Sequence, residues 1–179
     1  MSALVPGPRV LDLGIGPGTS ALEMARADPA RLHVGLDASA SMLARARARA
    51  RTSGTRLPLV RADALRLPVR DAAFDGATGH SLLYLLSDAP AVLREVRRAL
   101  RPGGRVAFLE PRQGAPDTGA AFRTSAHHAV AMVFWRGMSR LHRRYGEAEL
   151  AALLAEAGFS EARAWPVLSG FGVMATAER

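Results

Sequence analysis

The sequence contains no cysteine, no lysine and no asparagine, and isoleucine occurs once, at Ile15. Without cysteine the chain forms no disulfides, offers no thiolate to a metal and has no cysteine nucleophile. Without lysine it has no Schiff-base residue and no phosphate-binding lysine of the Walker type. No apolar run approaches the roughly 20 residues that a membrane-spanning helix needs. The first residues also lack the basic and then apolar pattern of a signal peptide, so we expect a cytoplasmic protein.

All 24 basic side chains are arginines, and the net charge is +8. The chain is also rich in alanine, glycine and proline, as a GC-rich genome would encode, so codon usage explains much of the arginine excess. The segment "ARARARARA" begins at Ala44. On a helix, Arg45 and Arg49 share one side while Arg47 and Arg51 share another, a pattern typical of a solvated face. We therefore do not expect a nucleic-acid partner.

Short apolar runs alternate with helical stretches, which predicts an α/β fold in a single domain, residues 1–179. We expect a doubly wound, mostly parallel sheet of seven strands with a C-terminal antiparallel hairpin. The predicted strands are Arg9–Gly14, Leu32–Leu36, Leu57–Ala62, Phe74–Gly79, Gly104–Glu110, Ala162–Leu168 and Phe171–Ala177. The predicted helices are Thr19–Ala27, Ser39–Arg51, Ala91–Leu100, Ala120–Arg143 and a late one ending at Gly158. Such sheets bind ligands at the carboxyl ends of their strands, where the strand order switches.

The segment after residue 111 differs from the alternating part and predicts a cover over the substrate, residues 111–145. Its long helix carries an apolar stripe at intervals of three and four residues. The stripe consists of Phe122, Ala126, Val130, Val133, Gly137 and Leu141. One interpretation buries this stripe in the core beneath a solvated face. In the other, aromatic residues and arginines of the same segment line a pocket for an aromatic or anionic acceptor.

The stretch "VLDLGIGPGTS", residues 10–20, is an apolar strand that runs into a glycine loop and then a helix. The dinucleotide fingerprint G-x-G-x-x-G needs a third glycine where this chain has Thr19. Asp12 is a second departure, because a carboxylate opposes a phosphate at a helix N-terminus. The same carboxylate suits a ligand that carries an ammonium and a sulfonium group. The loop therefore favours a cationic nucleoside ligand over a pyrophosphate.

Five segments, in the right order, resemble the motifs of the class I S-adenosylmethionine-dependent methyltransferases. They are "VLDLGIGPGTS", "VGLDAS", "VRADALRLP", "FDGATGHSLLYLLSD" and "RALRPGGRVAFLE". A sixth, "RRYGEAELAALLAEAGF", is similar to the late helix of the small-molecule branch related to quinone-biosynthesis methyltransferases. The family usually carries helices before the first motif as a lid. Here eight residues precede the first strand, so we expect the N-terminal lid helices to be absent or short.

The resemblance implies S-adenosylmethionine as the cofactor and assigns residues to it. Asp37, at the end of the second strand, would hold the ribose hydroxyls, a role that an acid at this position also has in dinucleotide sites. Asp63 and the backbone of Ala64 would meet the adenine, and Met42 would lie against it. The full predicted cofactor set is Asp12, Gly14, Gly16, Gly18, Asp37, Ala38, Met42, Asp63, Ala64, Leu65, Gly79 and His80.

His80, at the end of the fourth strand, is the predicted catalytic residue, because its ordinary pKa suits a general base. The alternative is a histidine that only packs beside the cofactor. The stretch "GHSLLY" lacks the Asn/Asp-Pro-Pro-aromatic motif of amino-methylating nucleic-acid enzymes. The predicted substrate residues are Tyr84, His127, Phe134, Trp135, Arg136 and Tyr145. We predict no metal site, since His127 and His128 are adjacent and point about 100° apart on a helix.

The sequence thus predicts methyl transfer from S-adenosylmethionine to a small molecule by in-line displacement. Three alternatives remain open at this point. The first is a non-catalytic S-adenosylmethionine-binding or partner module, and the second is an RNA or protein methyltransferase. The third and more remote alternative is an NAD-dependent oxidoreductase. The acceptor, the methylated atom and the oligomeric state, a homodimer included, stay open.

Overall fold

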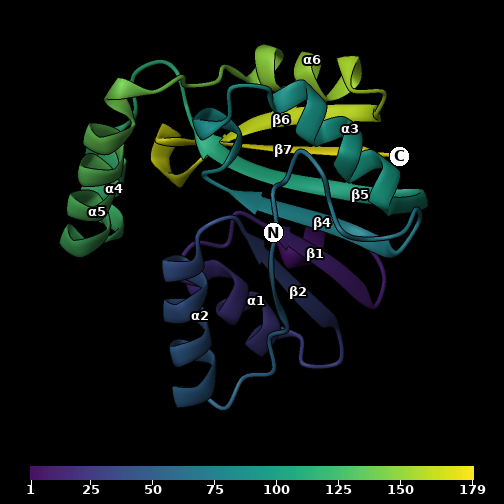
Figure 1. The fold of residues 1–179 in the computed structure, drawn as a ribbon. Coiled ribbons are helices and arrows are strands. Elements are labelled where there is room, and N and C mark those ends of the chain that lie inside the picture. The colour runs from purple at the N-terminus through teal and green to yellow at the C-terminus, as the bar shows by residue number, and fades with distance from the viewer.

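Seven strands form one sheet in the order β3-β2-β1-β4-β5-β7-β6 (Figure 1). The computed structural model describes the backbone of residues 1–179 and every side chain except those of Ser2, His128 and Arg140. The strands are β1 (Arg9–Leu13), β2 (Leu32–Asp37), β3 (Leu59–Arg61), β4 (Phe74–His80), β5 (Leu100–Pro111), β6 (Ser160–Val167) and β7 (Gly172–Glu178). Neighbours from β3 to β5 are parallel, whereas β7 is antiparallel to β5 and to β6. This confirms the predicted sheet and its C-terminal hairpin.

Six α-helices surround the sheet (Figure 1). They are α1 (Thr19–Ala27), α2 (Ala40–Thr52), α3 (Ala89–Ala99), α4 (Thr118–Thr124), α5 (Ala126–Met138) and α6 (Glu147–Glu156). Short 3-10 turns lie at Ser2–Leu4, Leu83–Leu85, Ser139–Leu141 and Leu168–Gly170. Helices α1 and α2 accompany β1 to β3, and α3 and α6 accompany β4 to β7. Right-handed crossovers that leave β1 in opposite directions place these two pairs on opposite faces of the sheet.

The strand order switches between β1 and β4, and sheets of this kind bind ligands at such a switch. From β1 the chain moves outward to β2 and β3, and then it returns to β4 on the other side of β1. The loops that follow β1 and β4 therefore diverge at the carboxyl edge of the sheet, which leaves an opening for a ligand. Helices α4 and α5 lie beside this edge and pack against Phe171 and Leu168 (Figure 1).

The long helix predicted for Ala120–Arg143 was wrong, because the structure has two helices there. Ser125 ends α4 in an extended conformation, with φ −173° and ψ 152°. Its carbonyl oxygen then accepts a hydrogen bond from the N–H of Ala129 and so begins α5. Continuous helical periodicity in the sequence does not reveal such a break, because a single extended residue leaves the flanking helical turns intact.

Of the two interpretations of the apolar stripe, the one that buries it in the core was wrong. Phe122, Val130, Val133 and Leu141 are exposed. The buried side of this helical pair consists instead of Ala121, Ala129, Met132 and Trp135, which pack against Phe171 and Leu168. Helix α5 is apolar on both sides, so periodicity alone could not decide which side faces the core.

Candidate functional site

Three glycines shape the turn between β1 and α1. Gly14, Gly16 and Gly18 have φ values of 60°, 53° and 82°, in the left-handed region that favours glycine. A Cβ on Gly14 would lie 2.6 Å from Cδ1 of Leu82, which any larger residue would have to displace. A Cβ on Gly16 would meet nothing within 4 Å. The turn therefore presents bare backbone to open space at Gly16, as a site for a closely held ligand requires.

Asp37, the last residue of β2, is fixed beside this turn by two backbone hydrogen bonds. The N–H of Gly16 donates to Oδ2 at 2.8 Å, and the N–H of Ser39 donates to Oδ1 at 2.8 Å. Each carboxylate oxygen keeps further acceptor capacity. Ser39 also caps α2 by accepting from the N–H of Met42, which places Met42 in the first turn of that helix. Asp37 thus offers a rigid, half-buried acceptor for a pair of hydroxyl groups.

The loop after β3 brings Asp63 to the same edge of the sheet. Asp37 pairs in register with Arg61, so Asp63 lies two residues beyond the end of that pairing. Its Oδ1 accepts from the N–H of Leu65 at 2.9 Å, which shapes the turn around the buried Ala64. Asp63 itself is exposed. The loop therefore offers an exposed carboxylate at the same edge of the sheet as Asp37.

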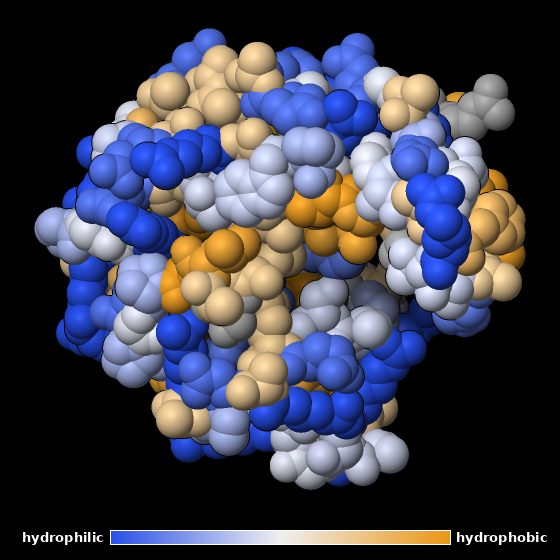
Figure 2. Space-filling view, turned by 180° about the vertical axis from the view of Figure 1, so that it is seen from behind, coloured by the Kyte–Doolittle hydropathy of each residue, from blue (hydrophilic) through white to orange (hydrophobic). Residues whose placement is uncertain are grey.

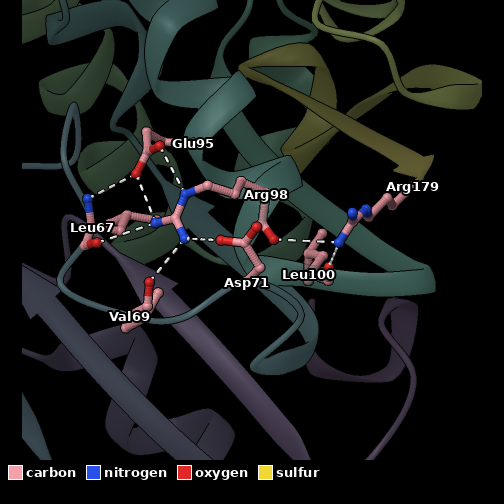
Figure 3. Close-up of polar contacts among 7 residues, drawn as sticks. All are labelled: Leu67, Val69, Asp71, Glu95, Arg98, Leu100 and Arg179. Atoms are coloured by element: carbon pink, nitrogen blue, oxygen red, sulfur yellow. Dashed lines mark hydrogen bonds and ion pairs between the residues drawn. The ribbon is translucent and has the colours of Figure 1, made fainter.

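Arg98 of α3 holds this loop in place (Figure 3). Its guanidinium donates to the carbonyl oxygens of Val69 at 2.9 Å and Leu67 at 3.2 Å, and to Asp71 Oδ1 at 2.6 Å. Glu95 binds the same guanidinium and accepts from the N–H of Leu67 at 3.0 Å. These contacts raise the pKa of Arg98 and keep it charged. Arg98 and Glu95 thus anchor the long loop between β3 and β4, which contains no helix or strand.

Asp12 is buried in the floor of the site, at the carboxyl end of β1. The side chain is 3% exposed, and Thr78 Oγ1 donates to its Oδ1 at 2.8 Å. The two residues are register partners of β1 and β4. Burial raises the pKa of Asp12 from 3.8 to about 7. A cation nearby would restore its ionised form, so Asp12 is suited to a positively charged ligand.

His80 ends β4 next to the glycine turn. Its Nδ1 lies 2.7 Å from Ser20 Oγ in the first turn of α1. Burial lowers the pKa of His80 below its ordinary value of 6.5, so the imidazole is neutral at pH 7. Its ring meets that of Trp135 edge to face, with centroids 6.2 Å apart, and Trp135 Nε1 donates to Ser81 Oγ at 3.2 Å. His80 is thus a neutral, oriented imidazole beside an aromatic wall.

Glu110 is a site-building residue that the sequence analysis missed. It is fully buried at the carboxyl end of β5 and accepts three backbone hydrogen bonds. The donors are the N–H groups of Leu82, Leu83 and Tyr84, at 3.0, 2.9 and 3.3 Å. Burial nevertheless raises its pKa from 4.5 to about 7. The acid that ends the apolar run "RVAFLE" was the available signal. Glu110 holds the turn that follows His80.

The structure separates the six predicted substrate residues. The ring of Trp135 contacts the ring of His80 edge to face. Tyr84 is half-buried and contacts the ring of His142 edge to face instead. Tyr145 is 1% exposed in the core, where its hydroxyl donates to the carbonyl oxygen of Leu83 at 3.3 Å. Tyr145 therefore packs behind the turn and does not line the opening.

The other three predicted substrate residues lie on α5, away from His80. Arg136 donates to the carbonyl oxygens of Arg112 and Gly114, at 3.4 and 2.7 Å, and so faces the loop after β5. His127 and Phe134 are exposed. His128, the other half of the histidine pair, has its side chain outside the described part. Among the described side chains no three histidines or carboxylates gather as a metal site would require.

Residues 10–104 match the family described as "Methyltransferase domain". The chain is 40% identical over 105 residues to a demethylmenaquinone methyltransferase of Corynebacterium kroppenstedtii, which covers 59% of this chain and 42% of that protein. It is 42% identical over 112 residues to a 2-phytyl-1,4-naphthoquinone methyltransferase of Synechococcus elongatus, which covers 61% and 48%. The chain spans about half the length of these curated relatives.

A solved structure of an S-adenosylmethionine-dependent methyltransferase from Aquifex aeolicus has the same fold. The TM-score is 0.75 at 19% identity, over 98% of this chain and 84% of that one. Among the residues that the structure describes, no helix is long and apolar enough to cross a membrane. The glycine turn, the fixed Asp37 and the buried Asp12 are suited to this family's cationic nucleoside cofactor. The chain belongs to the class I S-adenosylmethionine-dependent methyltransferases.

Proposed function

We propose that this chain transfers the methyl group of S-adenosylmethionine to a small aromatic acceptor. The observation that carries the proposal is the hydrogen bond from the N–H of Gly16 to Asp37. It holds the open glycine turn beside a carboxylate that is suited to bind ribose hydroxyls. His80 lies at the neighbouring strand end, where the acceptor would meet the methyl group. An activated methyl on a sulfonium sulfur is the chemistry that the cofactor supplies when bound.

The residues that would hold the cofactor are those of the β1, β2 and β3 ends. Asp37 would accept the two ribose hydroxyls, while Asp63 and the N–H of Ala64 would meet the adenine edge. Met42 would pack on the adenine face. Asp12 would balance the positive charge of the ligand from the floor of the site, ionised by that charge.

His80 would act as a general base where the acceptor loses a proton. Its contact with Ser20 engages Nδ1 and leaves Nε2 for the acceptor's hydroxyl. Because burial lowers the pKa of His80, the base is already neutral at physiological pH. The cofactor would supply the methyl group and keep the electron pair of the broken carbon–sulfur bond as a thioether, while Nε2 of His80 would take the proton that the acceptor's hydroxyl releases.

The aromatic character of the acceptor is suggested by Trp135, which stands beside His80, and by the relatives that are named as quinone methyltransferases. We further propose that residues 111–145 cover the acceptor, with Trp135 as the residue of α5 that faces it. The single chain of 179 residues would form one methyltransferase domain. A non-catalytic S-adenosylmethionine-binding module and a methyltransferase of RNA or protein are the outcomes that the following test separates.

The test measures transfer of a labelled methyl group from S-adenosylmethionine to a 1,4-naphthohydroquinone, a bulk RNA and a protein extract. We expect labelling of the hydroquinone. His80→Ala should lower kcat by about 10²- to 10⁴-fold, the usual contribution of a general base, with unchanged affinity for S-adenosylhomocysteine. Ser20→Ala should keep His80 as the base and change the pH dependence of kcat, because His80 Nδ1 loses its hydrogen-bond partner. Cofactor binding without methyl transfer to any acceptor would favour the non-catalytic module.

A further inference from the structure

Helix α5 carries apolar residues on two opposite sides, and the described part of the chain covers one of these sides. On the inner side, Ala129 is fully buried and Trp135 packs with it against the body of the molecule. On the other side, Val130, Val133 and Phe134 are 64%, 49% and 68% exposed. At 100° per residue these three lie on one stripe opposite the buried one. An amphipathic surface helix normally buries its apolar side and exposes a polar one, so a second apolar side that is exposed needs an explanation.

The exposed stripe extends beyond α5 at both ends. We define the outer face as the exposed apolar side chains of this helical pair and the turn after it: Phe122, Val130, Val133, Phe134, Met138 and Leu141. The exposed large apolar residues elsewhere in the chain, such as Leu65 and Trp165, are scattered singly. Figure 2 shows the molecule from behind, with α4 and α5 on the right. Hydrophobic surface appears on the outer edge of this helical pair, and the surface is hollowed between the pair and the rest of the molecule. Continuous apolar patches of this kind mark interaction sites.

The charge of the same segment indicates what covers the outer face. Residues 118–146 contain five arginines and no aspartate or glutamate. Flanking acids pair with two of these arginines: Asp117 with Arg123 at 3.5 Å, and Glu149 with Arg143. Arg136 and Arg144 instead donate to backbone carbonyl oxygens and to Ser139 Oγ, which leaves their charge uncompensated. The whole chain, this segment included, has a net charge of +8.

We propose that the outer face is a docking surface for an anionic lipid bilayer, in which α5 lies along the level of the head groups. An exposed apolar stripe on a basic helical segment is the pattern of interfacial helices, and anionic head groups complement the positive charge of the segment. A symmetric contact with a second copy would instead bring two basic segments together. This inference goes beyond methyl transfer, since it concerns where the molecule sits.

The test is sedimentation of the full chain with vesicles. Vesicles of equal parts phosphatidylcholine and phosphatidylglycerol should carry the protein down, phosphatidylcholine alone should carry much less, and added salt should release it. Phe134→Glu should lower the partition coefficient about tenfold or more, because the variant has no aromatic ring at this position to move from water into the bilayer. Trp165→Glu, an exposed aromatic on the edge strand β6, should bind vesicles as the wild type does.

Each other outcome overturns the proposal. Equal binding of wild type and Phe134→Glu would show that the outer face does not touch lipid, and absence of binding to the anionic vesicles would exclude the bilayer. A concentration-dependent dimer in analytical ultracentrifugation that Phe134→Glu abolishes would assign the face to a second copy. Calorimetric binding of S-adenosylhomocysteine by Phe134→Glu controls for folding, and it separates failure of docking from failure of the proposed activity.

Discussion

At the scale of single residues, Asp12 ties the affinity for the cofactor to pH. Burial raises the pKa of Asp12 to about 7, and its ionised form is the one that attracts a cation. Below that pH, binding a cation must release the proton, which weakens binding. We therefore predict that the affinity for S-adenosylmethionine rises as pH rises through about 7 and then levels off.

Isothermal titration calorimetry across this pH range measures the effect. The slope below the pKa should approach tenfold per pH unit, as loss of one proton requires. Asp12→Asn should show no slope and should bind more weakly than wild type at high pH. An affinity of the wild type that does not change with pH would mean that Asp12 does not compensate the ligand's charge.

The sequence predicted where such residues lie along the strands, but it did not predict their surroundings. Asp12 is the penultimate residue of β1, Asp37 ends β2, and Asp63 follows β3. The partner of Asp12 was not predicted, since contact with Thr78 depends on the register of β1 against β4. Glu110 was overlooked for a similar reason, because its hydrogen bonds reach a turn 26 to 28 residues away in sequence.

At the scale of structural elements, the glycine turn offers a matched pair of substitutions. Gly16 and Gly103 both have a left-handed φ, 53° and 74°, and a Cβ on either would meet nothing within 4 Å. Alanine at either position should therefore cost about 1 kcal/mol in backbone strain. Gly16→Ala should in addition lower the affinity for S-adenosylhomocysteine at least about tenfold, because its methyl group occupies the ligand's space.

Thermal unfolding and calorimetric titration of both variants distinguish the two effects. Gly103→Ala should lose stability and keep the wild-type affinity. If Gly16→Ala binds S-adenosylhomocysteine as well as Gly103→Ala does, the space beside Gly16 is not where the ligand lies.

The loop between β3 and β4 depends on Arg98, and Arg98→Met should loosen it (Figure 3). Methionine keeps the aliphatic packing but removes donors to two carbonyl oxygens and two carboxylates. We expect a loss of about 2 kcal/mol in unfolding free energy, since hydrogen bonds to charged groups carry this magnitude. Amide hydrogen exchange around residues 63–71 should also accelerate.

Arg94→Met is the matched control, because Arg94 is an exposed arginine of the same helix α3. It should change neither the stability nor the exchange of the loop by more than about 0.5 kcal/mol. Equal effects of the two variants would mean that the loop is held by its apolar contacts and not by the guanidinium.

The elements themselves followed from periodicity where one side of each was apolar. Helix α1 begins and ends as predicted, at Thr19 and Ala27, and each of the seven predicted strands is present, although β5 begins at Leu100 and not at Gly104. The prediction failed in α4 and α5, whose two apolar sides gave one continuous pattern and concealed the break at Ser125. Only one of these two apolar sides is buried, and the other is the exposed outer face.

At the scale of the whole molecule, two buried carboxyl groups make stability depend on pH. Asp12 and Glu110 titrate near 3.8 and 4.5 when unfolded, and burial raises both pKa values to about 7 in the folded chain. Between these values the unfolded chain has released both protons and the folded chain retains them. The contribution of these groups to the unfolding free energy therefore falls as pH rises from about 4.5 to about 7 and is constant above that range.

Urea unfolding of the wild type and of Asp12→Asn/Glu110→Gln, at about pH 5 and about pH 8, checks this sign. The wild type should lose more unfolding free energy between the two pH values than the double variant does. A double variant with an equal or larger loss would contradict the raised pKa values. Comparing the differences removes the contribution of all other titrating groups.

The central claim is that the β1, β2 and β3 ends form a site for S-adenosylmethionine, and calorimetric titration with S-adenosylhomocysteine tests it most directly. We predict saturable binding with one site per chain. Asp37→Ala should abolish it, while Glu161→Ala, an exposed acid on β6, should leave it intact. NAD should not bind. Binding of NAD without any response to S-adenosylhomocysteine, or full binding by Asp37→Ala, would contradict the account.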